Sequence, residues 1–474
     1  MIPNAQHFQG LSAAQPLVTI GYGRAEITPP LGTLCALGVD DEALEIIDPV
    51  YVRATVLGEG RSAVAILSLD VIGLYRPEID DLRGLIAANT GLAPERIILH
   101  TTHSHESPNT ERSFGALVAP YGLNWCTPEF YESLRGQALK AVKTALADMH
   151  PATVSTALWP VAEVASNRRL KPLDGPTVLR QSRSTAEYRQ YPEGWIDPYV
   201  RMLVFSDPAN GREHWLLNYA CHPTAAGGDE APYITGDFPG NAMARIEASR
   251  PRVTCNYLTG ACGNINPGKY TESGVTPAER AADVVRLGGR LAEAVLASRE
   301  RGLSPAAADA PRWARRPVAL PLLPRVADAG PLKEALAAEA QAYQVRRAAG
   351  QRVRGGGATL FWTVYNLFAA SSAQPDGTLA SEVCAIGLGE VGLLFLPGEC
   401  FLEIADAVRR HFPGRPLLIA ELCDAGPGYI VTPDAFAGGG YESEAALCAP
   451  EALQMLIDAG IAALEEVLPA REKA

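Results

Sequence analysis

Strand-like apolar runs alternate with segments of helical periodicity over almost the whole of this 474-residue chain. Apolar or alternating runs predict strands at residues 51–57, 62–69, 96–99, 202–205, 215–219, 253–258, 383–388, 391–396 and 417–421. Helical spacing of apolar residues is found at residues 77–90, 128–147, 240–249, 277–298, 331–348, 400–411 and 445–468. Because the two kinds of element interleave, the pattern predicts an α/β fold in which mixed β-sheets are flanked by helices.

The same interleaving favours one large domain that spans residues 1–474. A stretch rich in Ala and Pro at 304–316 is typical of a linker or of a long excursion from the fold. A helix rich in Ala, Glu and Arg follows it at 331–348. We therefore expect a helical insertion at about residues 304–371.

Charge and hydropathy exclude several classes of partner. The chain has 41 basic and 53 acidic residues, and the resulting net charge of -12 argues against nucleic acid or an anionic membrane as the main partner. No apolar run approaches the roughly 18–20 residues of a membrane span, and the N-terminus lacks the features of a secretory signal. Nine scattered cysteines without a Cys-x-x-Cys pair indicate reduced thiols. We expect a cytoplasmic protein without stable membrane association, and the sequence leaves a homo-oligomer open.

A cluster of histidines follows the predicted strand at 96–99. The chain has eight histidines, and His100, His103 and His105 fall close together in this one stretch. On an extended segment, residues i and i+2 share a face, so His103 and His105 would point into one site. Imidazole is the commonest metal ligand, and it titrates near neutrality. The stretch therefore suggests a metal ligand with a neighbouring base, and a polar turn after a strand is the alternative.

Further candidates stand where other predicted strands end, which is where α/β sheets usually place their sites. His222 follows the strand at 215–219, and Glu399 opens the helix at 400–411. Each also has an ordinary explanation, a turn for His222 and a favourable helix dipole for Glu399. Small-residue turns at 235–237 and 258–267 would let backbone N–H groups approach a substrate, although any tight turn uses such residues. Tyr429 and Tyr441 flank a loop rich in Pro and Gly.

Taken together and in order, these segments resemble the N-terminal catalytic domain of the neutral/alkaline non-lysosomal ceramidases. The matching segments are THSHESP at 102–108, NRR at 167–169, CHP at 221–223, TGD at 235–237, GNINP at 263–267, PGE at 397–399, GYIVTP at 428–433 and YES at 441–443. The segments 21–30 and 48–56 also look like the first strands of that family, so the resemblance runs over nearly the whole chain. Each motif is weak alone, and the ordered set is more specific.

The resemblance implies a zinc hydrolase that cleaves a carboxamide by attack of zinc-bound water. Its zinc ligands would be His103, His222, Glu399 and Tyr429, a set that combines two imidazoles and a carboxylate with a phenolate. His105 would act as the general base toward the water.

The resemblance also assigns groups that surround the zinc. Arg168 and Tyr441 would orient the substrate carbonyl and stabilise the oxyanion. Asp237 would hydrogen-bond to a ligand histidine and so fix the orientation of its ring. Asn266 and Gly263 would contact the substrate.

Three departures from the family pattern affect this reading. Asn266 and Asn264 replace the family's serine and aspartate, so a serine-based role is lost while a water-based mechanism survives. The chain stops after the helix near Leu468, so the family's C-terminal immunoglobulin-like domain is expected to be absent. No secretory signal is seen, which favours a smaller amide than ceramide as the substrate.

Two alternatives to the amidase stay open. The same zinc hydroxide would serve an esterase or lactonase, and the two Asn replacements would also suit a non-catalytic binding protein. The loops at 170–195 and 350–371 contain many Arg, Tyr and Gly residues, which hints at a polar or anionic group on the substrate.

Overall fold

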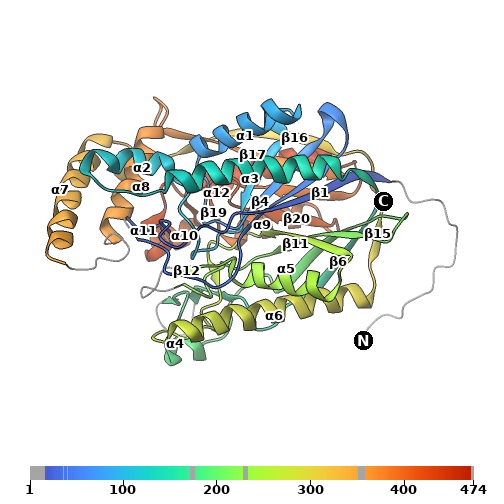
Figure 1. The fold of residues 1–474 in the computed structure, drawn as a ribbon, viewed down its shortest axis with the longest axis horizontal. Helices are drawn as coiled ribbons and strands as arrows, with labels where there is room; N and C mark the ends of the chain where they lie inside the picture. Colours follow the sequence, from blue (N-terminus) through green and yellow to red (C-terminus); the bar gives the residue numbers. More distant parts are fainter. Residues whose placement is uncertain are drawn as a thin grey trace.

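Two β-sheets pack face to face at the centre of the molecule, and helices cover both of their outer faces (Figure 1). The structure, a computed structural model, describes residues 17–35, 37–39, 41–170, 177–227, 233–350 and 358–470. Buried apolar side chains from both sheets fill the space between them, with Leu203 and Phe205 from one sheet and Ile386 and Phe395 from the other. The predicted fold class, mixed sheets flanked by helices, is confirmed.

The larger sheet has nine strands among the described residues, in the order β13-β11-β10-β6-β1-β3-β4-β5, with β15 paired to β6. The pairs β11–β13 and β4–β5 are parallel, and the other pairs are antiparallel. Its strands are β1 (Val18–Glu26), β3 (Tyr51–Leu57), β4 (Val64–Leu69), β5 (Ile97–Thr101), β6 (His150–Pro160), β10 (Tyr199–Ser206), β11 (Glu213–Tyr219), β13 (Val253–Thr259) and β15 (Ser304–Ala306).

The two ends of this sheet come together, because β13 also lies against β4 and β5. The Thr259 N–H donates to His100 Nε2 at 3.0 Å, and the Thr259 hydroxyl donates to the Thr102 carbonyl at 2.8 Å. Burial lowers the pKa of His100 to about 3, so this histidine is neutral. Its Nε2 accepts a hydrogen bond that joins β5 to β13. The end of β5, which leads to His103, therefore lies beside the ends of β11 and β13.

The smaller sheet has the strand order β16-β17-β18-β20, and its last pair is parallel. Its strands are β16 (Arg312–Pro321), β17 (Thr378–Leu388), β18 (Val391–Phe395) and β20 (Leu417–Ala420). Asn218 on β11 joins the two sheets, since its side chain donates to the Ile419 carbonyl at 3.0 Å and accepts from the Ile419 N–H at 3.2 Å. The carboxyl ends of β11, β13 and β20 are thus held in one region.

Helices α1 (Arg76–Thr90), α3 (Pro128–Ala147), α5 (Asp237–Ser249) and α6 (Pro277–Arg301) cover the larger sheet, and α9 (Leu402–His411) and α12 (Glu451–Val467) cover the smaller one. Gly21 and Gly23 let α3 lie directly on β1, because a Cβ at either position would stand 2.0 Å from a helix carbonyl oxygen. Helices α2 (Arg112–Val118), α7 (Ala329–Ala348) and α8 (Ala358–Ser372) gather at one end of the molecule, on the left in Figure 1.

Short elements complete the chain around the ends of the main strands. They are α4 (Ala186–Gln190), α10 (Pro433–Ala437) and α11 (Tyr441–Ala445), with the strands β2 (Glu45–Ile46), β7 (Ser166–Asn167), β8 (Arg169–Leu170), β9 (Val178–Leu179), β12 (Tyr233–Ile234), β14 (Ile265–Asn266), β19 (Glu399–Cys400) and β21 (Tyr429–Ile430). Single 3₁₀ turns occur at Gly60–Ser62, Pro94–Arg96, Ala119–Tyr121 and Pro324–Val326. The described residues contain no helix with both the length and the apolar character needed to cross a bilayer.

Three local predictions differ from the structure. Residues 304–316, expected as a linker or a long excursion from the fold, instead contribute to β15 and to the edge strand β16. Strand β16 was not predicted because it contains Pro317, which argues against a strand in the sequence. β16 lies at the edge of its sheet, and an edge strand tolerates a proline that a central strand does not. In the segment expected as a helical insertion, helix begins only at Ala329. The last long helix begins at Glu451 rather than at 445, directly after Pro450.

Candidate metal centre

The side chains of His103, His222 and Glu399 converge on one buried point. The His103 and His222 Nε2 atoms are 3.1 Å apart. Glu399 Oε2 lies 3.0 Å from His222 Nε2 and 3.3 Å from His103 Nε2. Three atoms from three distant parts of the chain therefore form a closed triangle with sides of similar length.

Backbone carbonyls fix the tautomer of both histidines. His103 Nδ1 donates to the Ile72 carbonyl at 2.6 Å, and His222 Nδ1 donates to the Cys262 carbonyl at 2.8 Å. A ring in its neutral form then presents its Nε2 lone pair to the other ring and to a carboxylate oxygen. A proton on one ring or a metal ion among the three atoms relieves the repulsion between them.

The triangle has the size that a small metal ion requires. Four ligands placed tetrahedrally at about 2.0–2.1 Å from zinc lie about 3.3 Å from one another. The measured separations of 3.0, 3.1 and 3.3 Å fit that spacing. The structure thus contains a candidate metal site built on histidine.

His105 and Tyr429 stand at the sides of the triangle. His105 Nε2 is 3.3 Å from His103 Nε2, and the ligand nitrogens of His103, His105 and His222 all lie within 4.8 Å of one another. The Tyr429 hydroxyl is 3.5 Å from His222 Nε2. Burial raises the pKa of Tyr429 well above its usual value, and the charge of Glu399 acts in the same direction.

Arg168 closes the site on the Tyr429 side. Its Nη1 donates to the Tyr429 hydroxyl at 3.1 Å, and its Nε lies 3.4 Å from the Glu442 carboxylate. The guanidinium also lies 5.0 Å from the centre of the Tyr441 ring, as in a cation–π contact. Arg168 is buried, whereas Tyr441 is 40 % exposed and faces the solvent side of the site.

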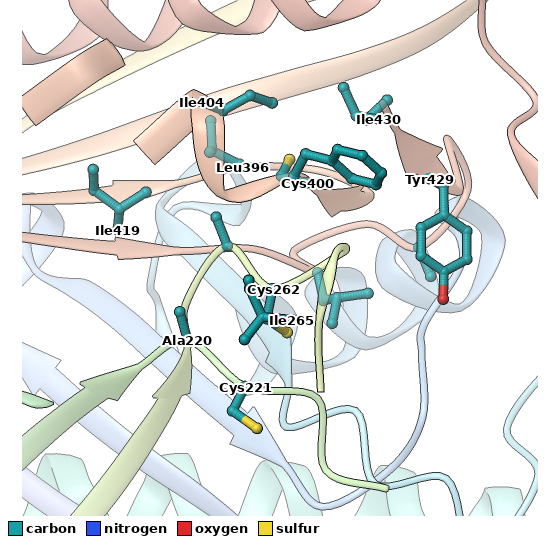
Figure 2. Packing of buried hydrophobic residues seen from close by; sticks show 14 of the residues in the cluster. Ala220, Cys221, Cys262, Ile265, Leu396, Cys400, Ile404, Ile419, Tyr429 and Ile430 are labelled. Atoms are coloured by element: carbon teal, nitrogen blue, oxygen red, sulfur yellow. The ribbon is translucent and has the colours of Figure 1, made fainter. Parts of the chain in front are cut away.

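Local backbone geometry delivers these side chains. His103 has a φ of 68°, a left-handed conformation that costs a non-glycine residue free energy and that is common at functional sites. The short parallel pair β19–β21 sets Glu399 directly beside Tyr429. Figure 2 shows the apolar residues behind this pair, with Cys262, Ile265, Cys400 and Ile430 in the cluster and the Tyr429 hydroxyl directed out of it.

Comparisons with known proteins give a fold and no sequence family. No protein-family model and no curated protein matches the sequence. The structure resembles a neutral ceramidase from Pseudomonas aeruginosa with a TM-score of 0.68 and 18 % identity, covering 97 % of this chain and 76 % of that chain. A structure described as a ceramidase complexed with C2 gives a TM-score of 0.67 and 17 % identity, covering 97 % of this chain and 77 % of that one. The chain has a ceramidase-like fold. This confirms the fold that the ordered motifs predicted.

In this ceramidase-like fold, the other predicted site residues have other visible contacts. Asp237 bonds the backbone N–H groups of Ala225 and Ala226 at 3.2 and 2.9 Å, so it holds the segment after His222 rather than a histidine ring. Gly263 donates its N–H to the Cys400 carbonyl at 2.8 Å and packs against Glu399. Its visible role is therefore to hold β19 in place.

The two asparagines that depart from the family pattern differ in their contacts. Asn264 accepts from the Leu402 N–H at 2.9 Å and so caps the start of α9. Asn266 accepts from the Gly268 N–H at 2.9 Å, while its buried Nδ2 has no partner among the described residues. The side-chain N–H groups of Asn266 are therefore available to donate to another group.

A cleft of about 470 Å³ opens onto the metal centre and reaches His105, His222, Arg168 and Tyr441. Sequence reasoning did not name several residues of its wall, among them Gln181, Arg183, Thr224 and Arg280. The Arg content of the loop at 170–195 was a weak signal for Arg183. Nothing in the sequence marked Arg280, which lies within the ordinary-looking helix α6.

Proposed function

We propose that this chain is a zinc-dependent hydrolase that cleaves a carboxamide of a small molecule. The observation that carries the proposal is the triangle of His103, His222 and Glu399, whose bare nitrogen and carboxylate atoms have the spacing of a zinc shell. The likeness to ceramidase structures supports amide hydrolysis.

The proposed ligands are His103, His222 and Glu399, with Tyr429 as a fourth group at the edge of the site. Zinc in this position would lower the pKa of a coordinated water toward neutrality and polarise a substrate carbonyl. Phenol deprotonation would be needed for strong coordination by Tyr429, and its raised pKa suits a weak ligand that yields to substrate.

His105 is the proposed general base. Burial lowers its pKa well below the usual value, and the neighbouring His103 and His222 add to that effect, so the ring is neutral at pH 7. A neutral imidazole accepts the proton of the attacking water and then donates it to the leaving nitrogen of the amide. The adjacent Nε2 of His103, 3.3 Å away, places His105 within reach of anything held at the triangle.

Arg168 and Tyr441 are the proposed groups for the substrate carbonyl. Arg168 is permanently charged, and its orientation is fixed by Tyr429 and Glu442. A fixed cation beside the triangle stabilises negative charge as it develops on the carbonyl oxygen. Tyr441 is exposed toward the cleft and carries a hydroxyl that can donate to the same oxygen.

Turnover of matched acyl compounds tests this function. We expect the purified protein to hydrolyse at least one member of a panel of N-acyl amides, and to lose activity on chelation and in His222→Ala. His411→Ala is the matched control, because His411 is an exposed histidine at the end of α9 that pairs with Glu465 of α12. Faster turnover of the ester than of the amide of one acyl group would favour the esterase alternative. No turnover of any amide, ester or lactone would contradict the proposal.

A further inference from the structure

The wall of the cleft at the metal centre is rich in cations. Arg168, Arg183 and Arg280 line it, and none of the described residues that line it is acidic. None is aliphatic either, since the others are histidine, tyrosine, glycine, or polar uncharged residues. A cleft built to hold an alkyl chain would present apolar side chains, so this wall does not suit an uncharged lipid.

Arg183 and Arg280 donate hydrogen bonds to the backbone of the segment that follows His222. Arg183 Nη1 donates to the Ala225 carbonyl, and Arg280 Nη1 donates to the Gly227 carbonyl at 2.9 Å. Both acceptors belong to the segment that begins at His222. The two guanidinium groups are therefore held in a fixed relation to the metal centre.

Among the described residues, few carboxylates lie close to Arg183 and Arg280. Arg183 pairs with Asp283 at 2.6 Å, and Asp283 also bonds Arg286. Arg280 is 6 % exposed, its Nε and Nη1 bond backbone carbonyls, and no carboxylate pairs with it in the described part of the chain. The pKa of Arg183 is lowered, first by burial and then through the proximity of Arg280. Among the described residues, two cations thus lie close together, and the carboxylates that act on them are Asp283, which Arg183 shares with Arg286, and Asp237, whose charge also acts on Arg183.

Helix stability does not account for Arg280. It stands in the first turn of α6, which begins at Pro277, where the helix dipole disfavours a cation. A hydrogen bond to a carbonyl needs only a neutral donor, whereas a buried guanidinium without a counter-charge is costly. An anion placed in the cleft would remove that cost, because guanidinium groups match the geometry of carboxylate and related oxyanions.

We propose that Arg280 and Arg183 bind an anionic group of the substrate, a carboxylate or another oxyanion, so that the substrate is an anionic small-molecule amide. This rests on the proposed hydrolase function for the reaction, and it adds the class of molecule on which the reaction occurs.

Two sets of matched compounds test the charge preference. The first set places the anionic group on the amine part of the amide, and the second places it on the acyl part. One set compares N-hexanoylglycine and N-hexanoyltaurine with uncharged N-hexanoylethanolamine, and the other compares succinyl with butanoyl 4-nitroanilide. The quantity compared is kcat/KM for compounds that are hydrolysed and the calorimetric Kd for those that are not. The glycine and taurine arms separate a carboxylate from a sulfonate as the preferred oxyanion.

We expect an anionic member to be preferred by about tenfold or more in one set. Arg280→Gln should abolish that preference by weakening the value for the anionic compound, and circular dichroism of the variant checks that the protein is folded. Arg280→Lys should keep part of the preference. Arg290→Gln should keep all of it, because Arg290 lies on the same helix outside the cleft and pairs with Glu163.

Equal values for charged and uncharged compounds in both sets would overturn the proposal, as would a preference that survives in Arg280→Gln. Binding of the anionic compound through Arg280 without hydrolysis of any compound would overturn the hydrolase function and leave the anion site standing.

Discussion

A methyl group added at Gly263 should disturb the metal centre from a position that carries no ligand. A Cβ at this residue would stand 2.5 Å from the Glu399 carbonyl oxygen and 3.0 Å from the Cys400 carbonyl carbon. Carbon and oxygen need about 3.3 Å when they are not bonded, so the Gly263→Ala variant must move the two segments apart by roughly 0.8 Å. The hydrogen bond from the Gly263 N–H to the Cys400 carbonyl, 2.8 Å long, is stretched by the same movement.

That displacement acts directly on the proposed ligand. Glu399 Oε2 lies 3.0 and 3.3 Å from its two histidine partners, and metal–ligand distances tolerate only about 0.2 Å of error. We expect zinc affinity to fall about 10–100-fold in Gly263→Ala, the range seen when groups that support ligands are lost. Overpacking should also lower the free energy of unfolding by about 1–3 kcal/mol.

Chelator competition measures the zinc affinity, and urea unfolding measures the stability. Gly84→Ala is the matched control, because Gly84 is an exposed residue of α1 and a Cβ added there would meet no neighbouring atom within 4 Å. It should keep the zinc affinity and gain up to about 1 kcal/mol of stability from helix propensity. Zinc affinity in Gly263→Ala equal to that of the unaltered protein would show that the contact of Gly263 with β19 does not position Glu399.

Three further predictions concern a base, a cation and a buried acid. His105→Ala should lower kcat about 10²–10⁴-fold with bound zinc retained, and an unchanged kcat would remove the base role. Arg168→Lys should lower kcat about 100-fold or more in steady-state assays, because a lysine cannot reproduce the fixed guanidinium; a change in KM alone would contradict this. Burial raises the pKa of Glu111 to about 7 from 4.5, so the native chain holds a proton there that the unfolded chain has already lost. Its contribution to stability is therefore full below about pH 4.5 and is lost as the pH rises through about 7. Urea midpoints between pH 5 and 8 should fall less in Glu111→Gln than in the unaltered protein, and equal slopes would contradict the assignment.

The sequence predicted the limits of a helix or strand best where a clear hydrophobic period ended at a clear boundary residue. Strand β3 and helix α3 have the predicted limits, since α3 begins at Pro128 and shows a clean apolar face. Strand β16 was missed because its prolines are tolerated only at a sheet edge, and edge position is a tertiary property. Strand β1 was recognised only through the family resemblance, because Gly21 and Gly23 weaken its strand pattern in favour of contact with α3.

The candidate site was predicted where chemistry and chain position agreed. His103 and His222 follow the ends of β5 and β11, and the structure brings them within 3.1 Å. Their convergence depends on the bonds between β13 and β5, which no local pattern reports. The cleft arginines were missed for a related reason. Arg183 and Arg280 lie about a hundred residues apart and meet only through the segment after His222.

Metal analysis of the purified protein and of two histidine variants shows whether His103, His222 and Glu399 hold a zinc ion. We expect about one zinc per chain in the unaltered protein and in His105→Ala, and loss of zinc in His222→Ala. Absence of metal from the unaltered protein, or full retention in His222→Ala, would contradict this expectation.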